Sequence, residues 1–184
     1  MSAPPTAVRT APPPWATNVS GSVERVRAAL GAAGHDDTIT MFPEGTRTAQ
    51  DAAAAVGCTV AQIAKSIVLR AGERVILVVA SGGNRVDTAK VAALLGAPVK
   101  PADGRWVRDV TGFAIGGVAP VGHLSPVRVF IDADLLVLDP IWAAAGTPRH
   151  VFRTRAADLV RMSGGEVADI RNAVDAFRAR EAIH

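Results

Sequence analysis

The chain has 184 residues, of which 49% are hydrophobic and 20% charged. This length fits one domain with a core of its own, and the composition excludes both a disordered chain and, because no apolar run approaches roughly 18 residues, a membrane span. The 20 Lys and Arg residues against 17 Asp and Glu give a net charge of +3, which is compatible with a nucleic-acid partner but too small to indicate one.

Residues 1–17 hold five prolines and few large apolar side chains, so we expect them to form a disordered tail outside the core. Residues 18–184 are expected to form the single domain. The N-terminal region lacks the continuous apolar stretch of a secretory signal, and the one cysteine, Cys58, cannot form an internal disulfide. A cytoplasmic protein is the simplest interpretation.

Apolar residues three and four apart, bounded by capping residues, predict helices, and short continuous apolar runs predict strands. In the first third of the chain we expect a helix from Ser20 or Ser22 to Gly31 or Gly34, a strand at 38–42, and a helix capped by Thr48 and Asp51 and ended by Gly57. A hairpin of strands at 66–70 and 74–80 follows, then a helix from Asp87 to Gly96 and a short helix between Pro101 and Thr111. The last third is expected to hold strands at 127–131 and 140–144 with one turn at 132–136 between them, a strand at 150–153, and a helix capped by Thr154 that reaches about Met162. Short strands at irregular intervals with helices between them indicate an α+β fold on a mixed, largely antiparallel sheet.

One lysine interrupts the apolar stretch Ala61–Leu69, whose sequence is AQIAKSIVL. Desolvating an ammonium group is unfavourable unless a partner or an anionic ligand compensates, so Lys65 needs an explanation. Lys65 either ends a helical turn begun at Thr59 and extends into solvent, or it meets an anionic ligand. A second stretch, Ile115–His123, has paired glycines whose backbone can approach a ligand closely and direct N–H groups at it.

Four segments in this order, AQIAKSIVL, SGGNRVDTAKVAALLG, TGFAIGGVAPVGH and SGGEVADI, resemble the YbaK family, which is similar to the editing insertion domain of bacterial prolyl-tRNA synthetase. The resemblance runs from about Val23 to Ile170. It implies a twisted, partly barrel-like mixed sheet with flanking helices and a cleft between them. A doubly wound fold would need a phosphate loop after the first strand, and segment 43–47 has only one glycine.

The resemblance further implies a trans-editing aminoacyl-tRNA deacylase, a hydrolase of the ester bond in mischarged tRNA, most often tRNA for proline. The amino acid removed stays open among alanine, cysteine, serine and threonine. The implied partners are the acceptor end of aminoacyl-tRNA and prolyl-tRNA synthetase, with no membrane, no cofactor, and a monomer or weak homodimer. The alternative is a non-catalytic module of the same fold that binds aminoacyl-tRNA or a synthetase.

Residues carried over from the resemblance form two groups. Lys65, Gly116 and Gly117 are the expected catalytic residues: the ammonium would hold a phosphate or the terminal ribose, and loop N–H groups would stabilise charge on the carbonyl oxygen. The expected substrate-binding residues are Phe42, Thr46, Ser66, Asn84, Val118, Pro120 and Gly146.

Other chemistries have weaker support in the sequence. The four histidines and Cys58 show none of the short spacings of zinc sites, so no metal is expected. Cys58 is interpreted as a small core residue rather than a nucleophile. The segment Ser81–Asn84 is either a phosphate-binding nest or, as the sequence favours, a strand-to-helix turn. His123 is assigned no proton-transfer role.

Overall fold

The computed structural model describes residues 19–173. Its helices are α1 (Val19–Ala32), α2 (Ala49–Val56), α3 (Thr88–Leu95), α4 (Gly104–Thr111) and α5 (Ala156–Ser163), with 3-10 turns η1 (Val60–Gln62) and η2 (Ala133–Val137). Its strands are β1 (Ile39–Met41), β2 (Ile63–Ala71), β3 (Arg74–Ser81), β4 (Lys100–Pro101), β5 (Val127–Asp132), β6 (Ile141–Ala144), β7 (His150–Thr154) and β8 (Glu166–Ala168). The predicted tail, residues 1–17, lies outside the described residues, and the single domain over 18–184 stays a prediction.

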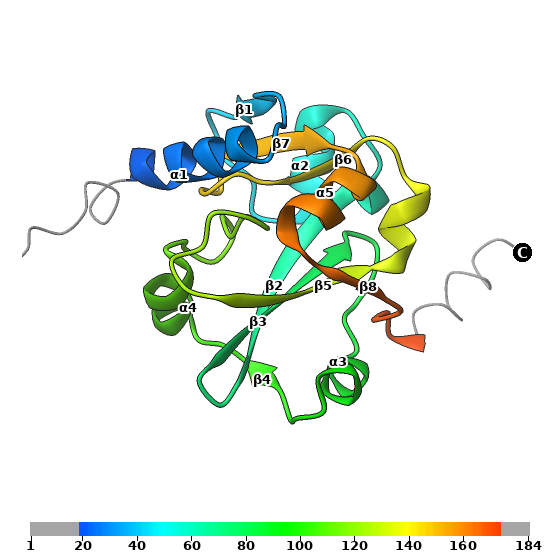
Figure 1. Cartoon of the computed structure of the whole chain (residues 1–184). Helices are drawn as coiled ribbons and strands as arrows, with labels where there is room; N and C mark the ends of the chain where they lie inside the picture. The colour runs from blue at the N-terminus through cyan, green and yellow to red at the C-terminus, as the bar shows by residue number, and fades with distance from the viewer. Residues whose placement is uncertain (1–18, 174–184) are drawn as a thin grey trace, which may run out of the picture.

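The described strands form one mixed sheet in the order β1-β7-β6-β2-β3-β5-β8, with β4 paired to β2 (Figure 1). Four of these pairings are antiparallel and three are parallel. The central hairpin, β2 and β3, is long because both strands are almost continuously apolar, and β3 is buried from its second residue to its last. The mixed sheet with flanking helices confirms the predicted α+β fold and excludes the doubly wound alternative.

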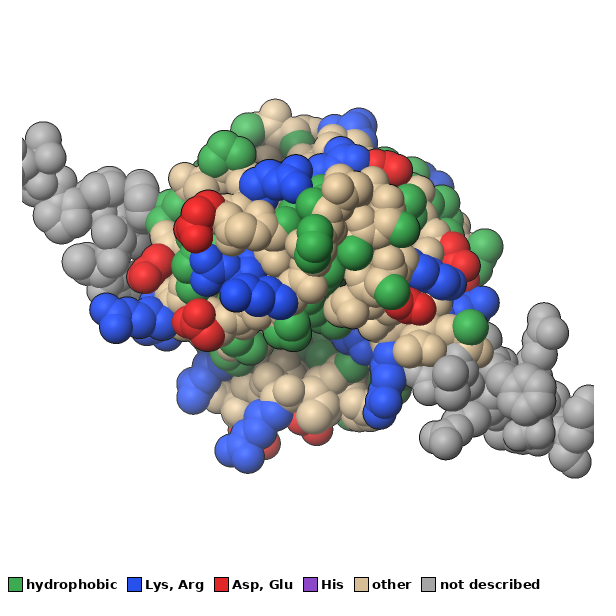
Figure 2. All heavy atoms as spheres, turned by 90° about the horizontal axis from the view of Figure 1, so that it is seen from below, with side chains coloured by type: hydrophobic (Ala, Val, Ile, Leu, Met, Phe, Trp, Pro, Cys, Tyr) green, Lys and Arg blue, Asp and Glu red, His purple; other side chains and the backbone are tan. Residues whose placement is uncertain are grey.

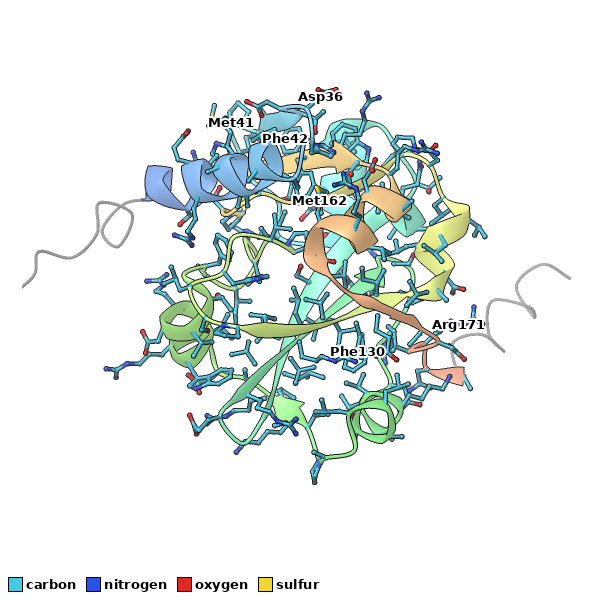
Figure 3. The ribbon with its side chains drawn as sticks, in the orientation of Figure 1. Asp36, Met41, Phe42, Phe130, Met162 and Arg171 are labelled. Carbon is cyan, nitrogen blue, oxygen red and sulfur yellow. The ribbon has the colours of Figure 1, made fainter. Side chains whose placement is uncertain are left out.

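Two apolar clusters cover opposite sides of the hairpin. The larger one packs α1, α4 and α5 against side chains such as Leu77 and Phe152. The smaller one packs α3 against Phe130 and Ile76, and Figure 3 labels Phe130 between the sheet and that helix. Alternate residues of β3 therefore enter different clusters, as expected of a strand buried on both faces.

Most predicted helix boundaries follow from capping chemistry. Thr48 and Asp51 form a reciprocal capping box at the start of α2, and Asp87 accepts two backbone N–H groups at the start of α3. Two predicted starts were wrong. Helix α1 begins at Val19, before either predicted cap, and α5 begins after Arg155, which makes no side-chain cap, rather than after Thr154.

Candidate active site

Lys65 is the third residue of β2 and pairs across the hairpin with Ala80. The idea that it ends a helical turn was therefore wrong, because the strand already begins at Ile63. Strand β2 pairs with β6 only over its first two residues and with β4 only near its far end. On the edge of β2 that faces away from β3, no strand within residues 19–173 pairs with Lys65 or Ser66, and this gap in the sheet is where the candidate site lies.

Backbone carbonyl groups hold the Lys65 side chain, which is partly buried. Its ammonium donates a hydrogen bond to the carbonyl oxygen of Asn84 and lies 3.5 Å from that of Gly82. Both carbonyls belong to the turn that follows β3. Because a partly buried ammonium needs polar partners, this turn fixes the position of the charge at the site.

The turn Ser81–Asn84 is itself tightly held. The Gly82 N–H donates to Ile63 O at 2.7 Å, and the Asn84 N–H donates to Ser81 O at 2.9 Å. The Ser81 N–H donates to Asp132 Oδ2 at 3.0 Å. Three of the four N–H groups are therefore used within the fold, so the segment is the strand-to-helix turn that the sequence favoured rather than a phosphate nest.

Asp132 is a buried carboxylate, 1% exposed, that anchors this turn. Besides the Ser81 N–H, its oxygens accept Asn84 Nδ2 at 2.8 Å and the Asp134 N–H at 3.0 Å. Buried side-chain oxygens need such partners. The Asn84 side chain also donates to Asp134 Oδ2 at 2.8 Å and its carbonyl oxygen accepts from Lys65, so Asn84 serves the turn, and its direct contact with substrate stays a prediction.

A cavity of about 140 Å³ opens beside the gap in the sheet. An apolar cavity of about 150 Å³ is known to admit benzene, so this one has room for a small side chain. Five of the predicted site residues line it: Thr46, Lys65, Ser66, Gly116 and Val118. Its remaining wall is largely apolar and comes from α2, β2, β6 and β7, with members such as Ala52, Ile63, Ala144 and Val151.

Gly117 does not offer a free backbone donor, because its N–H already donates to Ala114 O at 2.9 Å. This bond does not support its expected role in stabilising the carbonyl oxygen, which stays a prediction. A Cβ at Gly117 would lie 2.5 Å from the Thr147 Cα, so glycine is needed there for close packing of two backbones. Among the described residues, neither the Gly116 N–H nor the Val118 N–H has a hydrogen-bond partner, and both residues line the cavity.

The other predicted pocket residues lie around the cavity rather than in its wall. Phe42 donates its N–H to Arg149 O at 2.7 Å, and Figure 3 shows it beside Met41 near β1. Gly146 packs against α1, where a Cβ would lie 2.8 Å from the Ser22 carbonyl. Pro120 is buried in the glycine loop. These three shape the surrounding backbone.

Sequence reasoning missed several cavity residues: Arg47, Thr48, Trp142, Thr147 and His150. His150 Nδ1 lies 2.6 Å from Thr147 Oγ1, and burial, with the charges of Arg27 and Arg149, lowers the pKa of His150. No motif marks Trp142, Thr147 or His150, because they lie on β6, on β7 and between them, and only the pairing order of the sheet brings these strands to the cavity. Arg47, directly after Thr46 in the loop before α2, was the one member that its position could have suggested.

His123 braces the glycine loop. Its Nε2 lies 2.7 Å from Ala119 O, and its ring meets Phe113 edge-on at 5.8 Å. The Arg25 guanidinium stacks on the Phe113 ring, with its Cζ 4.5 Å from the ring centroid, and donates a hydrogen bond to Gly122 O at 2.7 Å. Burial lowers the pKa of His123, and the charge of Arg25 lowers it further, although the Ala119 carbonyl raises it.

This lowered pKa predicts that the protein loses stability in mild acid. Near its ordinary pKa of 6.5, His123 binds more protons in the unfolded chain than in the folded one. The free energy of unfolding should therefore be highest above about pH 6.5 and fall as the pH drops towards the folded pKa. Denaturant unfolding at about pH 7.5 and about pH 5.5 measures this change.

His123→Gln should reduce the difference between the two pH values without abolishing it, because the pKa of His150 is lowered as well. His35→Gln serves as the control, because the His35 ring contacts Thr154, which lies at the opposite end of β7 from His150. If the free energy of unfolding changed between the two pH values by as much in His123→Gln as in the wild type, His123 would not be a source of the acid sensitivity.

Within residues 19–173, no three His, Cys, Asp or Glu side chains are grouped as metal ligands would be. Over the same range, no helix has the length and apolar character needed to cross a membrane. Cys58 is a partly buried thiol whose pKa is raised by burial, which disfavours the thiolate form that a nucleophile requires.

Comparison with known proteins gives the family. Residues 43–162 match the model of the aminoacyl-tRNA editing domain. The uncharacterised protein YwhH of Bacillus subtilis is 28% identical over 147 residues, which cover 79% of this chain and 94% of YwhH. The proline–tRNA ligase of Thiobacillus denitrificans is 31% identical over 131 residues, 69% of this chain but only 22% of the ligase.

Among solved structures, a proposed trans-editing enzyme for prolyl-tRNA synthetase superimposes with a TM-score of 0.78 at 43% identity. The superposition covers 82% of this chain and 97% of that protein. The chain corresponds to about a fifth of the ligase's length, so it matches an editing segment and not the whole ligase. The chain belongs to the aminoacyl-tRNA editing domain family, as a YbaK-like aminoacyl-tRNA deacylase.

Proposed function

We propose that this protein acts in trans on mischarged tRNA for proline and hydrolyses the ester that links a small wrong amino acid to the terminal ribose. One observation carries the proposal. Lys65, whose ammonium is held by carbonyl groups of the turn after β3, lines the same small and largely apolar cavity as Gly116 and Val118 of the glycine loop. A cation for the polyanionic end of tRNA thus stands beside a space of amino-acid size.

In this mechanism Lys65 binds the terminal phosphate or the hydroxyl groups of the 3′ ribose. A water molecule attacks the ester carbonyl, and the Gly116 and Val118 N–H groups stabilise the negative charge that develops on the carbonyl oxygen. The bond from the carbonyl carbon to the ribose oxygen then breaks, and that oxygen takes a proton from the attacking water. The products are the free amino acid and uncharged tRNA. Since an aminoacyl ester is already activated, positioning can supply much of the rate.

The lining of the cavity supports selection by the shape of the side chain. Small side chains line it, including Ala52, Ala64, Ala143 and Ala144, and the volume is about 140 Å³. A proline ring is smaller than benzene, so the volume alone does not exclude it. The rigid ring closed on the amino nitrogen, however, has fewer orientations than alanine or serine in a site whose glycine loop is packed on the backbone of Thr147. We therefore propose that correctly charged prolyl-tRNA is spared.

Basic side chains are scattered on the face shown in Figure 2, where Lys and Arg alternate with Asp and Glu rather than forming one broad patch. Together with the net charge of +3, this is compatible with a small number of phosphate contacts, as recognition of an acceptor end alone would require. A synthetase partner would then supply any further reading of the tRNA.

A deacylation panel tests the proposal. Transcripts of tRNA for proline that carry alanine, cysteine, serine, threonine or proline are each incubated with the protein in the presence of a chelator. We expect hydrolysis of at least one mischarged species and none of prolyl-tRNA. The rate should fall as salt is raised, because the contacts are to phosphate.

The same amino acids on tRNA for alanine or threonine provide the control for tRNA choice. If no species of tRNA for proline were hydrolysed above background by a folded sample, tRNA for proline would be wrong as the substrate. Hydrolysis of prolyl-tRNA at a comparable rate would instead overturn selection by side-chain shape.

A further inference from the structure

The hydroxyl group of Ser66 is an exception among the buried polar groups. Within residues 19–173, Ser66 Oγ is the one buried side-chain nitrogen or oxygen that has no hydrogen-bond partner. Buried hydroxyl groups are nearly always satisfied, because burial without a partner is unfavourable. Ser66 lies in the wall of the cavity, directly after Lys65 on β2. An unsatisfied group at this place indicates a ligand that supplies the missing hydrogen bond.

The other hydroxyl groups in the cavity wall already have partners. Thr46 Oγ1 donates to Pro148 O at 3.1 Å, and Thr48 Oγ1 accepts the Asp51 N–H at 3.1 Å. Thr147 Oγ1 lies 2.6 Å from His150 Nδ1. Ser66 is therefore the hydroxyl of this wall that is left to hydrogen-bond with a ligand, and because its Oγ is buried, the side chain must turn into the cavity to do so. The surrounding wall offers mostly apolar surface from residues such as Ile63 and Ala143.

We propose that Ser66 is the specificity-determining residue of this site and that it selects amino acids carrying a side-chain hydroxyl, serine and threonine, over alanine. This inference rests on the proposed deacylase function. A hydroxyl group both donates and accepts, so the substrate hydroxyl and Ser66 Oγ satisfy each other inside the cavity. With alanine in place of serine, Ser66 Oγ stays unsatisfied, and a site built around a buried polar group disfavours a ligand that lacks the matching group.

The inference also predicts an effect on the free protein. In the absence of substrate the unsatisfied hydroxyl opposes folding, so Ser66→Ala should melt at the wild-type temperature or above it. A serine that served the fold through its own hydrogen bonds would give the opposite result, a lower melting temperature. This measurement separates a recognition role from a structural one.

The decisive experiment compares ratios of kcat/KM for seryl- and alanyl-tRNA for proline in two variants. Ser66→Ala should lower the seryl-to-alanyl ratio by about tenfold, the effect of one hydrogen bond. Thr46→Val is the matched control, because it removes a hydroxyl from the same wall that already has a protein partner. Its ratio should stay that of the wild type, whatever its absolute rate.

Binding of two non-hydrolysable probes keeps the inference testable if the tRNA substrate proves to be different. These are the serine and alanine amides of 3′-amino-3′-deoxyadenosine, measured by calorimetry with wild type and Ser66→Ala. Preference for the seryl probe that disappears in Ser66→Ala would support the inference even if the panel showed no deacylation, in which case only the proposed function fails. Equal loss for both probes would assign Ser66 to the common amino or ribose group and overturn it. No change with either probe would mean that Ser66 binds only water, and would overturn it as well.

Discussion

Replacement of Lys65 with alanine should lower deacylation by about a hundredfold or more while the fold stays intact. Loss of one preorganised polar contact at an active site commonly has an effect of this size. The side chain is bound by carbonyl groups of a turn that is independently held by Asp132, so the turn keeps its shape without the ammonium. Single-turnover rates on the best substrate of the panel and circular dichroism measure the two quantities.

A salt series distinguishes substrate contact from a general loss of charge. If Lys65 binds phosphate, Lys65→Ala should give a shallower dependence of log rate on log salt than the wild type. Lys100→Ala removes the same charge from an exposed position on β4 and should preserve both rate and slope. Lys65→Arg should recover only part of the rate, because a planar guanidinium cannot replace an ammonium between two carbonyl groups.

An unfolded Lys65→Ala protein would show that the lysine serves the fold. A folded variant with near wild-type rates would remove Lys65 from the mechanism. The second result would require another cation at the cavity, and Arg47, which lines it, is the candidate.

Local sequence signals were sufficient where a boundary depends on neighbouring residues. The Thr48 capping box, the Asp87 cap and the glycines after α2 and α3 were all predictable, because each hydrogen bond or left-handed conformation involves residues a few positions apart. The start of β2 was not predictable in this way. It begins at Ile63 because β6, far along the chain, pairs with its first two residues.

The same distinction applies to the site. Lys65, Ser66 and Gly116 were identified from motifs, and the structure brings them to one cavity. What the motifs could not give is how each backbone group is used: the Gly117 N–H is already bonded to Ala114 O, and the Asn84 side chain is bonded to two aspartates. Those partners depend on how the turn and the loop fold back, which no short segment encodes.

Two adjacent glycines in the turn that holds Lys65 should respond in opposite ways to the same substitution. A Cβ at Gly82 would lie 2.3 Å from the Val60 carbonyl oxygen and 3.0 Å from the Ala49 Cβ, whereas a Cβ at Gly83 meets nothing within 4 Å. Gly82→Ala must therefore displace the turn or η1, and overpacking of this kind commonly costs about 1–3 kcal/mol. Gly83→Ala should be neutral or slightly stabilising, because alanine restricts the unfolded chain more than glycine does.

The Gly82→Ala effect should extend from stability to activity. Its melting temperature should fall by several degrees, since 1 kcal/mol corresponds to about 2–4 °C for a domain of this size. The carbonyl groups of Gly82 and Asn84 position the Lys65 ammonium. A displacement of about 1 Å at a catalytic group can lower the rate by about a hundredfold. Gly83→Ala should keep both the wild-type melting temperature and the wild-type rate. Equal behaviour of the two variants would mean that the turn is not packed against η1 as described, and that the position of Lys65 is set by something other than these carbonyl groups.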